Sequence, residues 1–255
     1  MATTFLTLTN EILRELNEIE LTAATFANAK GIQNFVKNSI NKSINDIANQ
    51  EPQLPFFAVA ASGETDPFYG NVTVASVAGT RWYTLKSGSS SITTDYSSID
   101  WDDFYLTTIN VSGETAPFVS QGLKFITLDD WTRYLRDAEN NDDADTQQHG
   151  QPKYVIRSPD HRKFGLSPIP DKVYNVHFYA YVAPTALSAY SDEITLPDQY
   201  SNVITARARY YVWQFKESPQ QAAFAMDDYK KSMKQMKSNL INPAPKYVGD
   251  DRMYF

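Results

Sequence analysis

Apolar residues recur at helical spacing near the N-terminus. One stripe in residues 7–20 predicts a short helix, and a second at intervals of three and four predicts a helix over residues 29–49. Pro52 and Pro55 end the second helix, because the residue before a proline disfavours helical backbone. The first stripe consists of Ile12, Leu13, Leu16 and Ile19. The second consists of Ile32, Val36, Ile40, Ile44 and Ile47.

The C-terminal fifth of the chain predicts two more helices. Asp198 follows Pro197 and suits the N-cap of a helix over residues 198–215. A capping box at residues 218–221 then starts a helix that reaches about residue 240, and the short connection makes the two helices antiparallel. The first should bury Val203, Ile204, Ala208, Tyr211, Val212 and Phe215. The second should bury Ala222, Met226, Tyr229, Met233, Met236 and Leu240.

Between these helices the hydrophobic period changes to two, which predicts strands. Short runs lie at residues 56–61, 71–77, 81–86, 104–109 and 153–157. The clearest hairpin joins residues 164–169 to residues 173–182 through a turn at 170–172. One face of its second strand should be buried, and the other face should be partly exposed to solvent. The buried face carries Tyr174, Val176, Phe178, Ala180 and Val182, and the other carries Asn175, His177, Tyr179 and Tyr181.

This order of elements predicts an α+β protein. The terminal helices should meet in a four-helix bundle, because their apolar stripes have no other cover, and the mainly antiparallel β domain is inserted at one end. The predicted parts are residues 1–53 and 191–241 for the bundle, 54–190 for the β domain and 242–255 for an extended C-terminal tail. Two low-complexity segments, residues 87–94 and 137–151, should be mobile loops.

Composition narrows the function. The 255 residues carry a net charge of −7, which argues against a strongly basic nucleic-acid-binding surface. The absence of cysteine excludes disulfides and thiolate zinc sites. No signal peptide or membrane span is visible, so we expect a soluble protein made in a cytoplasm. The 13% share of aromatic residues suits a chain with many half-buried strands.

A search for catalytic chemistry finds no site. The three histidines, His149, His161 and His177, do not stand at zinc-ligand spacing, and His177 is best interpreted as a neutral strand residue. The sequence contains neither a phosphate-binding glycine loop nor a nucleophile elbow. We therefore predict no catalytic, metal or cofactor-binding residues and no cofactor.

Two segments are candidates for partner contacts. The lysines of the last helix form either a solvated face or a surface for a partner or for DNA; they are Lys230, Lys231, Lys234 and Lys237. The tail is either a disordered end or a docking peptide, and its exposed apolar residues favour docking. The residues assigned to docking are Pro243, Pro245, Tyr247, Val248, Arg252, Met253, Tyr254 and Phe255. The acids of residues 137–151 could also meet a basic partner.

Four segments resemble a known family. They are LTNEILRELNE at residues 8–18, IDWDDF at 99–104, GLSPIPD at 165–171 and LPDQY at 196–200. Together they are similar to the head-to-tail adaptor proteins of tailed bacteriophages, which in short-tailed phages are also called tail tubular protein A. The similarity covers most of the chain, in the same order of helices, strands and helices.

The resemblance implies a structural virion protein and no enzyme. It implies a ring of twelve copies beneath the dodecameric portal, with the tail nozzle or tail fibres attached below and double-stranded DNA passing through during genome ejection. The tail, residues 243–255, would run onto the portal, and the lysine face could line the lumen or meet a partner. Such a protein is assembled in the host cytoplasm and resides in the virion neck.

Other functions stay open on sequence alone. A tail-tube or tail-completion ring would share most of these features. A carbohydrate-binding module is suggested by Trp82, Trp101 and the tyrosine-rich strand faces. An enzyme ranks last, because no polar residues converge in a recognisable motif.

Overall fold

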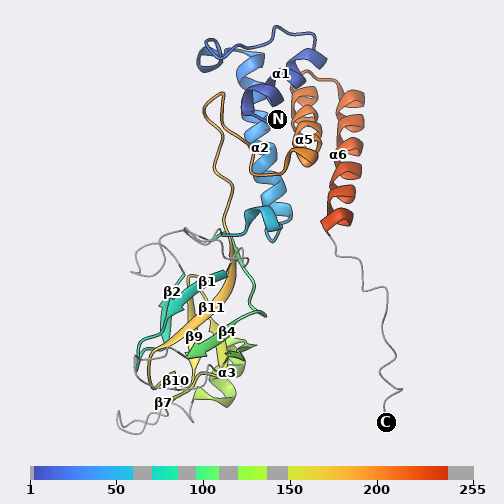
Figure 1. The fold of residues 1–255 in the computed structure, drawn as a ribbon. Helices are drawn as coiled ribbons and strands as arrows, with labels where there is room; N and C mark the ends of the chain where they lie inside the picture. The colour runs from blue at the N-terminus through green and yellow to red at the C-terminus, as the bar shows by residue number, and fades with distance from the viewer. Residues whose placement is uncertain (1–2, 60–70, 86–95, 109–119, 137–148, 241–255) are drawn as a thin grey trace, which may run out of the picture. The chain divides into compact units, whose positions relative to one another are not determined.

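The computed structural model describes residues 3–59, 71–85, 96–108, 120–136 and 149–240. The chain folds into two units: a helical unit, Met1–Ile47 with Thr185–Phe255, and a β unit, Ala48–Pro184. Five α-helices and several mainly antiparallel sheets lie within the described ranges, so the protein is α+β (Figure 1). The finer division at residues 53, 190 and 241 stays a prediction.

The helical unit begins with α1 (Phe5–Glu15). The Thr4 side chain caps α1 by accepting a hydrogen bond from the Thr7 backbone N–H. The helix ends because Asn17 adopts a left-handed backbone with φ 55°. The N–H groups of Asn17 and Glu18 then donate to the carbonyls of Arg14 and Leu13, which is a Schellman cap.

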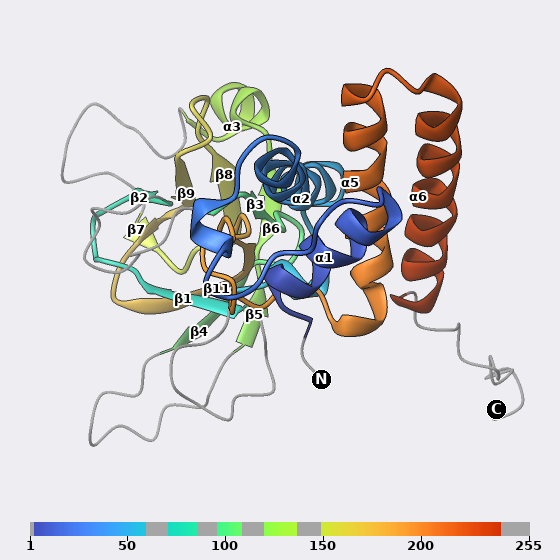
Figure 2. The same cartoon turned by 90° about the horizontal axis from the view of Figure 1, so that it is seen from above.

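The other long helices are α2 (Ile32–Gln50), α5 (Ser201–Phe215) and α6 (Pro219–Leu240). Glu217, at φ 55°, ends α5 with a second Schellman cap and turns the chain into α6. The two helices pack side by side (Figures 1 and 2). Short 3-10 turns are η1 (Phe26–Asn28) and η4 (Asp198–Tyr200). The unit buries Leu8, Ile12, Leu13, Val36, Ile40, Ile47, Val203, Ile204, Val212, Tyr229, Met233 and Met236.

Three details differ from the sequence predictions. Asp198 does not cap the helix; its carboxylate accepts the Thr3 backbone N–H at 2.7 Å. Ile19 is 81% exposed, because the cap at Asn17 ends α1 before the stripe reaches it. Phe215 is exposed rather than inward-facing, and its ring stacks on Phe35 of α2 at 4.3 Å between centroids.

Two asparagines hold the irregular connections of the helical unit. The side-chain amide of Asn10 exchanges two hydrogen bonds with the backbone of Leu21, each 2.8 Å. Asn41 of α2 does the same with the backbone of Leu187, at 2.9 Å each. Each amide satisfies one N–H and one C=O that lack a partner in regular structure. The second pair ties the C-terminal half of the chain to α2.

The β unit contains two larger sheets and a short parallel pair, β7 with β10. One sheet has the order β1-β11-β4-β5, with β3 also paired to β11, and the other has the order β2-β9-β8-β6. The strands are β1 (Asn71–Ala75), β2 (Trp82–Thr84), β3 (Ser98–Ile99), β4 (Tyr105–Thr108), β5 (Ser120–Gly122), β6 (Lys124–Ile126), β7 (His149–Gly150), β8 (Tyr154–Arg157), β9 (Lys163–Ser167), β10 (Ile169–Pro170) and β11 (Tyr174–Tyr181).

Aromatic side chains join the two larger sheets. Phe178 of β11 and Phe164 of β9 lie 5.7 Å apart between ring centroids, and Phe104 contacts both at 4.9 and 5.7 Å. These three rings are fully buried and belong to one core cluster with residues of both sheets. The predicted alternation of β11 is confirmed, since Tyr174, Val176, Phe178 and Ala180 are buried and the residues between them are half-buried.

The predicted hairpin at residues 164–182 is wrong. β9 pairs with β8 and β2, whereas β11 pairs with β1, β3 and β4, so the two strands lie in different sheets. Pro168 and Pro170 lack the N–H groups that a continuous ladder would need between them. Residues 55–57 likewise form a 3-10 turn, η2 (Pro55–Phe57), where a strand was predicted.

A helix in the β unit was missed. α3 (Leu128–Tyr134) begins at Thr127, whose hydroxyl accepts the Asp130 N–H and donates to the Asp130 carboxylate. This pairing at a spacing of three is a capping signal that the sequence already carried. The predicted loop at 87–94 and most of the one at 137–151 lie outside the described residues; β7 occupies the end of the second.

His177 of β11 is held between two hydroxyls. The Thr73 Oγ1 lies 2.9 Å from its Nδ1 and the Thr107 Oγ1 lies 2.8 Å from its Nε2. Its ring also stacks on Tyr105 at 4.6 Å. A neutral imidazole satisfies both contacts, and burial lowers the pKa of His177 below its ordinary value. This agrees with the neutral strand histidine predicted from the sequence.

We predict that the β unit loses stability as pH falls from about 7 to about 5. The unfolded chain takes up a proton near the ordinary histidine pKa of about 6.5, whereas folded His177 resists protonation to lower pH. Folding stability from this residue is therefore complete above about pH 6.5 and declines below it. Urea unfolding at several pH values should show this slope. His177→Gln should flatten it, and an unchanged slope in that variant would contradict the assignment.

Candidate functional site

The centre of the helical unit is a charged cluster on α5. The Arg207 Nε and Nη2 each lie 3.0 Å from the Asp46 Oδ2 of α2, and Nη2 also donates to the Tyr211 hydroxyl at 3.0 Å. The Tyr211 hydroxyl itself donates to Asp46. The guanidinium carbon lies 5.0 to 5.2 Å from three tyrosine ring centroids, those of Tyr210, Tyr211 and Tyr229. One arginine thus links α2, α5 and α6.

Electrostatics in this cluster favour the charged arginine and the neutral tyrosine. Burial opposes the charge of Arg207, but the hydrogen bond to Asp46 and nearby negative charge raise its pKa overall. Burial and the Asp46 carboxylate raise the pKa of Tyr211 to about 12. Both shifts keep Arg207 charged and Tyr211 neutral.

A second arginine on α5 reaches α1. Arg209 Nη2 lies 2.5 Å from Glu15 Oε1 and 3.3 Å from Glu11 Oε1. Positions 207 and 209 are about 200° apart around a helix, so the two arginines leave α5 on opposite sides. Burial raises the pKa of Glu15, and Arg209 partly offsets that effect. The helix α5 therefore contacts α1 on one side and α2 on the other.

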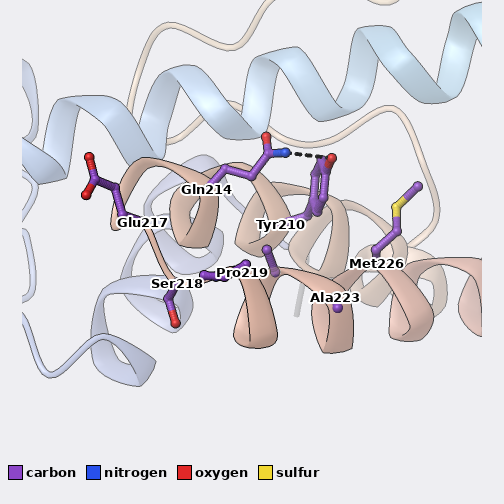
Figure 3. A pocket seen from close by; sticks show the side chains of 8 residues that line it. Tyr210, Gln214, Glu217, Ser218, Pro219, Ala223 and Met226 are labelled. Atoms are coloured by element: carbon purple, nitrogen blue, oxygen red, sulfur yellow. Dashed lines mark hydrogen bonds between the residues drawn. The ribbon is translucent and has the colours of Figure 1, made fainter.

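The α5–α6 pair carries a pocket of about 530 Å³. Figure 3 shows its lining, in which Gln214 donates a hydrogen bond to the Tyr210 hydroxyl at 2.7 Å. On α6, the lining includes Ala223 and Met226. A cavity of about 150 Å³ already accepts benzene, so this pocket has room for an aromatic side chain. The remaining lining residues are Glu217, Ser218, Pro219 and Ala222.

Phe224 stands on the opposite side of α6 from this pocket. At about 100° per residue it lies about 200° from the pocket residues Ala222 and Met226. Its side chain is 66% exposed. A single exposed aromatic side chain is ordinary on a protein surface, and it would bury apolar area if a partner covered it. The helix α6 thus presents a projecting ring on one side and an apolar hollow on the other.

The four predicted lysines cover an arc of about 120° on α6. Lys230, Lys231 and Lys234 are exposed, and Lys237 is half-buried. Asp227 falls within the same arc one turn earlier and is also exposed. The face is therefore mixed rather than purely basic. None of the four lysines lines the pocket, although Lys230 follows the pocket residue Met226 by about one turn of α6.

The predicted docking tail, residues 243–255, lies outside the described residues. Within the described ranges, no group of three or more histidine or acidic side chains could hold a metal ion. No helix in those ranges combines the length and apolarity that crossing a bilayer requires. Trp101, one basis of the carbohydrate interpretation, stacks on Phe104 at 5.5 Å and 18°, which occupies one face of its ring.

Sequence reasoning missed the Arg207 cluster and the pocket. It placed Tyr211 on the buried face of its helix. A usable signal existed, because Arg207, Tyr210 and Tyr211 lie three and four residues apart and therefore on one helix side. Their partner Asp46 could not be found, since it is 161 residues away in the chain.

The whole chain was compared with known protein families and with curated proteins. The model of the SU10 adaptor protein family matches residues 3–249, which covers both the helical unit and the β unit. No curated protein matches the sequence.

We predict that Asp46→Asn lowers the free energy of unfolding of the helical unit by about 2 kcal/mol, because Arg207 keeps its charge without a counter-ion in a partly buried site. Glu20→Gln is the matched control. Its carboxylate pairs with Arg14 at the surface, at 2.9 Å, and such an exposed pair contributes little to stability because water screens it. Urea unfolding followed by far-ultraviolet circular dichroism measures both. Equal effects of the two substitutions would contradict the central role of Arg207.

Proposed function

The chain belongs to the SU10 adaptor protein family, and we propose that twelve copies of it form the ring that joins a phage portal to the tail. Membership makes it a bacteriophage head–tail adaptor-type protein, a structural component of the virion neck that interacts with portal and tail proteins. The ring, its copy number and its contacts are the proposal. The closer grouping with tail tubular protein A is part of it.

The proposed ring is supported by the two different sides of α6, one with the exposed Phe224 and the other with the pocket residues. A closed ring needs a heterologous contact, in which one face of each subunit meets a different face of its neighbour. Phe224 supplies a projecting aromatic ring, and the pocket beside Tyr210 and Met226 supplies the hollow. We propose that Phe224 of each copy enters the pocket of the next.

The wall of the ring would come from the helical unit. We propose that α1, α2, α5 and α6 form a four-helix bundle, supported by the contacts of Arg207 and Arg209 with the first two helices. A net charge of −7 suits a conduit through which DNA passes without binding tightly. The lysine face also carries Asp227, whose negative charge lowers its net positive charge. It would therefore contact DNA or a partner only loosely.

The ends of the assembly would be joined by other segments. We propose that residues 243–255 dock on the portal, because their aromatic and apolar side chains are unfavourable in water. Loops of the β unit would meet the nozzle or the tail fibres.

We predict that Phe224→Ser and Ala223→Trp each prevent ring closure on portal-bearing heads. The first removes the projecting ring and the second fills the hollow, while both positions are exposed and tolerate substitution. The bound copies per head, measured by quantitative gel analysis, should fall far below the wild-type number. Tyr134→Ser is the control, because that exposed aromatic lies in the β unit.

Mixing the two variants sharpens the test. A Phe224→Ser subunit keeps its hollow and an Ala223→Trp subunit keeps its projecting ring, so one productive contact remains between them. The mixture should give pairs that do not extend, as seen by cross-linking on the heads. Wild-type copy numbers for either variant alone would overturn the proposed contact.

We also predict that deleting residues 243–255 leaves a folded protein that no longer joins portal-filled heads. Circular dichroism and thermal unfolding should match the full chain, because the described helices end at Leu240. The full-length chain with Tyr247, Tyr254 and Phe255 replaced by serine is the matched variant and should fail in the same way. Normal joining by the truncated protein would remove the tail from the portal contact.

A further inference from the structure

Arg157 of the β unit has no counter-ion among the residues that the structure describes. Arg157 is the last residue of β8, and its guanidinium carbon lies 5.7 Å from the ring centroid of Trp101. The side chain is half-buried. Within the part of the chain that the structure describes, its guanidinium forms no ion pair or side-chain hydrogen bond. A guanidinium offers five N–H donors in a planar fork, so this one is available to an external acceptor.

The ring of Trp101 holds this arginine in place. One ring face stacks on Phe104, and Phe125 packs against the same indole at 5.7 Å. Trp101 and Phe125 both pack against the core of the β unit. The guanidinium therefore rests on a fixed aromatic surface, which reduces the entropy that it loses when it binds a ligand.

A rigid turn places a second polar group beside Arg157. Ser158 begins the connection from β8 to β9; its hydroxyl donates to Asp160 at 2.5 Å and accepts the Lys163 N–H at 3.0 Å. His161 in this turn has φ 57°, a left-handed backbone that glycine adopts at lower cost. Its imidazole is exposed. The turn thus presents His161 from a strained position.

Arg157 and His161 separate two adjoining pockets. The first, of about 330 Å³, lies against the start of α3 and includes Thr127 and Asp129. The second, of about 270 Å³, is lined by Ser97, Ser98 and Trp101, among others. Both pockets contain Arg157 and His161. Figure 2 shows β8, β9 and α3 next to one another on the β unit. An extended segment that crosses this partition can place side chains in both pockets.

We propose that Arg157 and His161 form a subsite for a carboxylate side chain of a protein partner. A carboxylate accepts two parallel hydrogen bonds from a guanidinium, and a third donor from the imidazole would complete its contacts. The surroundings disfavour a polyanion such as DNA, because Asp100, Asp129 and Asp160 lie beside the partition in sequence or in the pocket lining. A single Asp or Glu side chain on an extended segment fits these surroundings, in which basic and acidic groups lie close together. The assignment goes beyond the ring and does not depend on it.

The test is a titration of the full-length protein with a blocked six-residue peptide that carries one glutamate among serines, followed by NMR of the Arg157 Nε–H and the His161 ring. Saturable shifts of both signals are expected with this glutamate peptide and not with the same peptide carrying glutamine. Arg157→Gln should weaken binding by about tenfold or more, since a charge-assisted bidentate contact is lost. Arg157→Lys should restore only part of it, because an ammonium lacks the planar fork.

His161→Gly separates binding from folding. Glycine relieves the left-handed backbone, so the thermal midpoint should stay or rise while binding of the glutamate peptide weakens. Inorganic phosphate and a short DNA duplex at matched ionic strength are the competing ligands. Tighter binding of either one, equal binding of the glutamine peptide, or unchanged binding by Arg157→Gln would overturn the carboxylate subsite.

Discussion

The helical unit depends on one ion pair, between Arg207 of α5 and Asp46 of α2. These residues are 161 positions apart, and the β unit is inserted between them. Apolar stripes alone hold helices together but allow them to slide, whereas a partly buried ion pair is satisfied in one register only. We interpret the pair as the element that fixes this register. Its three tyrosine neighbours and the Tyr211 hydroxyl complete the contacts of Arg207.

The same helix explains how the two ends of the chain form one unit. Arg209 extends from α5 toward Glu11 and Glu15 of α1, on the side away from Arg207. The caps at Asn17 and Glu217 then determine where α1 and α5 stop and where the next segments begin. As a result α6 packs on α5 and keeps one side free. That side carries Phe224, and the hollow beside Met226 opens at the α5–α6 seam.

Helices were the most predictable part of this fold. The stripe of α6 and the alternation of β11 were visible in the sequence, because each reflects a single period of burial. Local periodicity cannot show which strands pair. For that reason the strands at residues 164–169 and 173–182 were joined in a hairpin, although they belong to different sheets. The end of α1 was missed because the left-handed backbone of Asn17 leaves no periodic signal.

The candidate surfaces were less predictable than the fold. The exposure of Phe224 depends on which side of α6 packs on α5, and the position of Arg157 between two pockets depends on the tertiary pairing of β8. Neither follows from residue type. Family membership gives the general role, and the two-sided α6 gives a physical route to a closed ring.

The number of copies around the neck axis tests this account most directly. Electron microscopy of particles that carry this chain, averaged without imposed symmetry, should show twelve copies in register with the portal, with neighbouring α6 helices in contact. Six copies, or a single copy beside the axis, would contradict it.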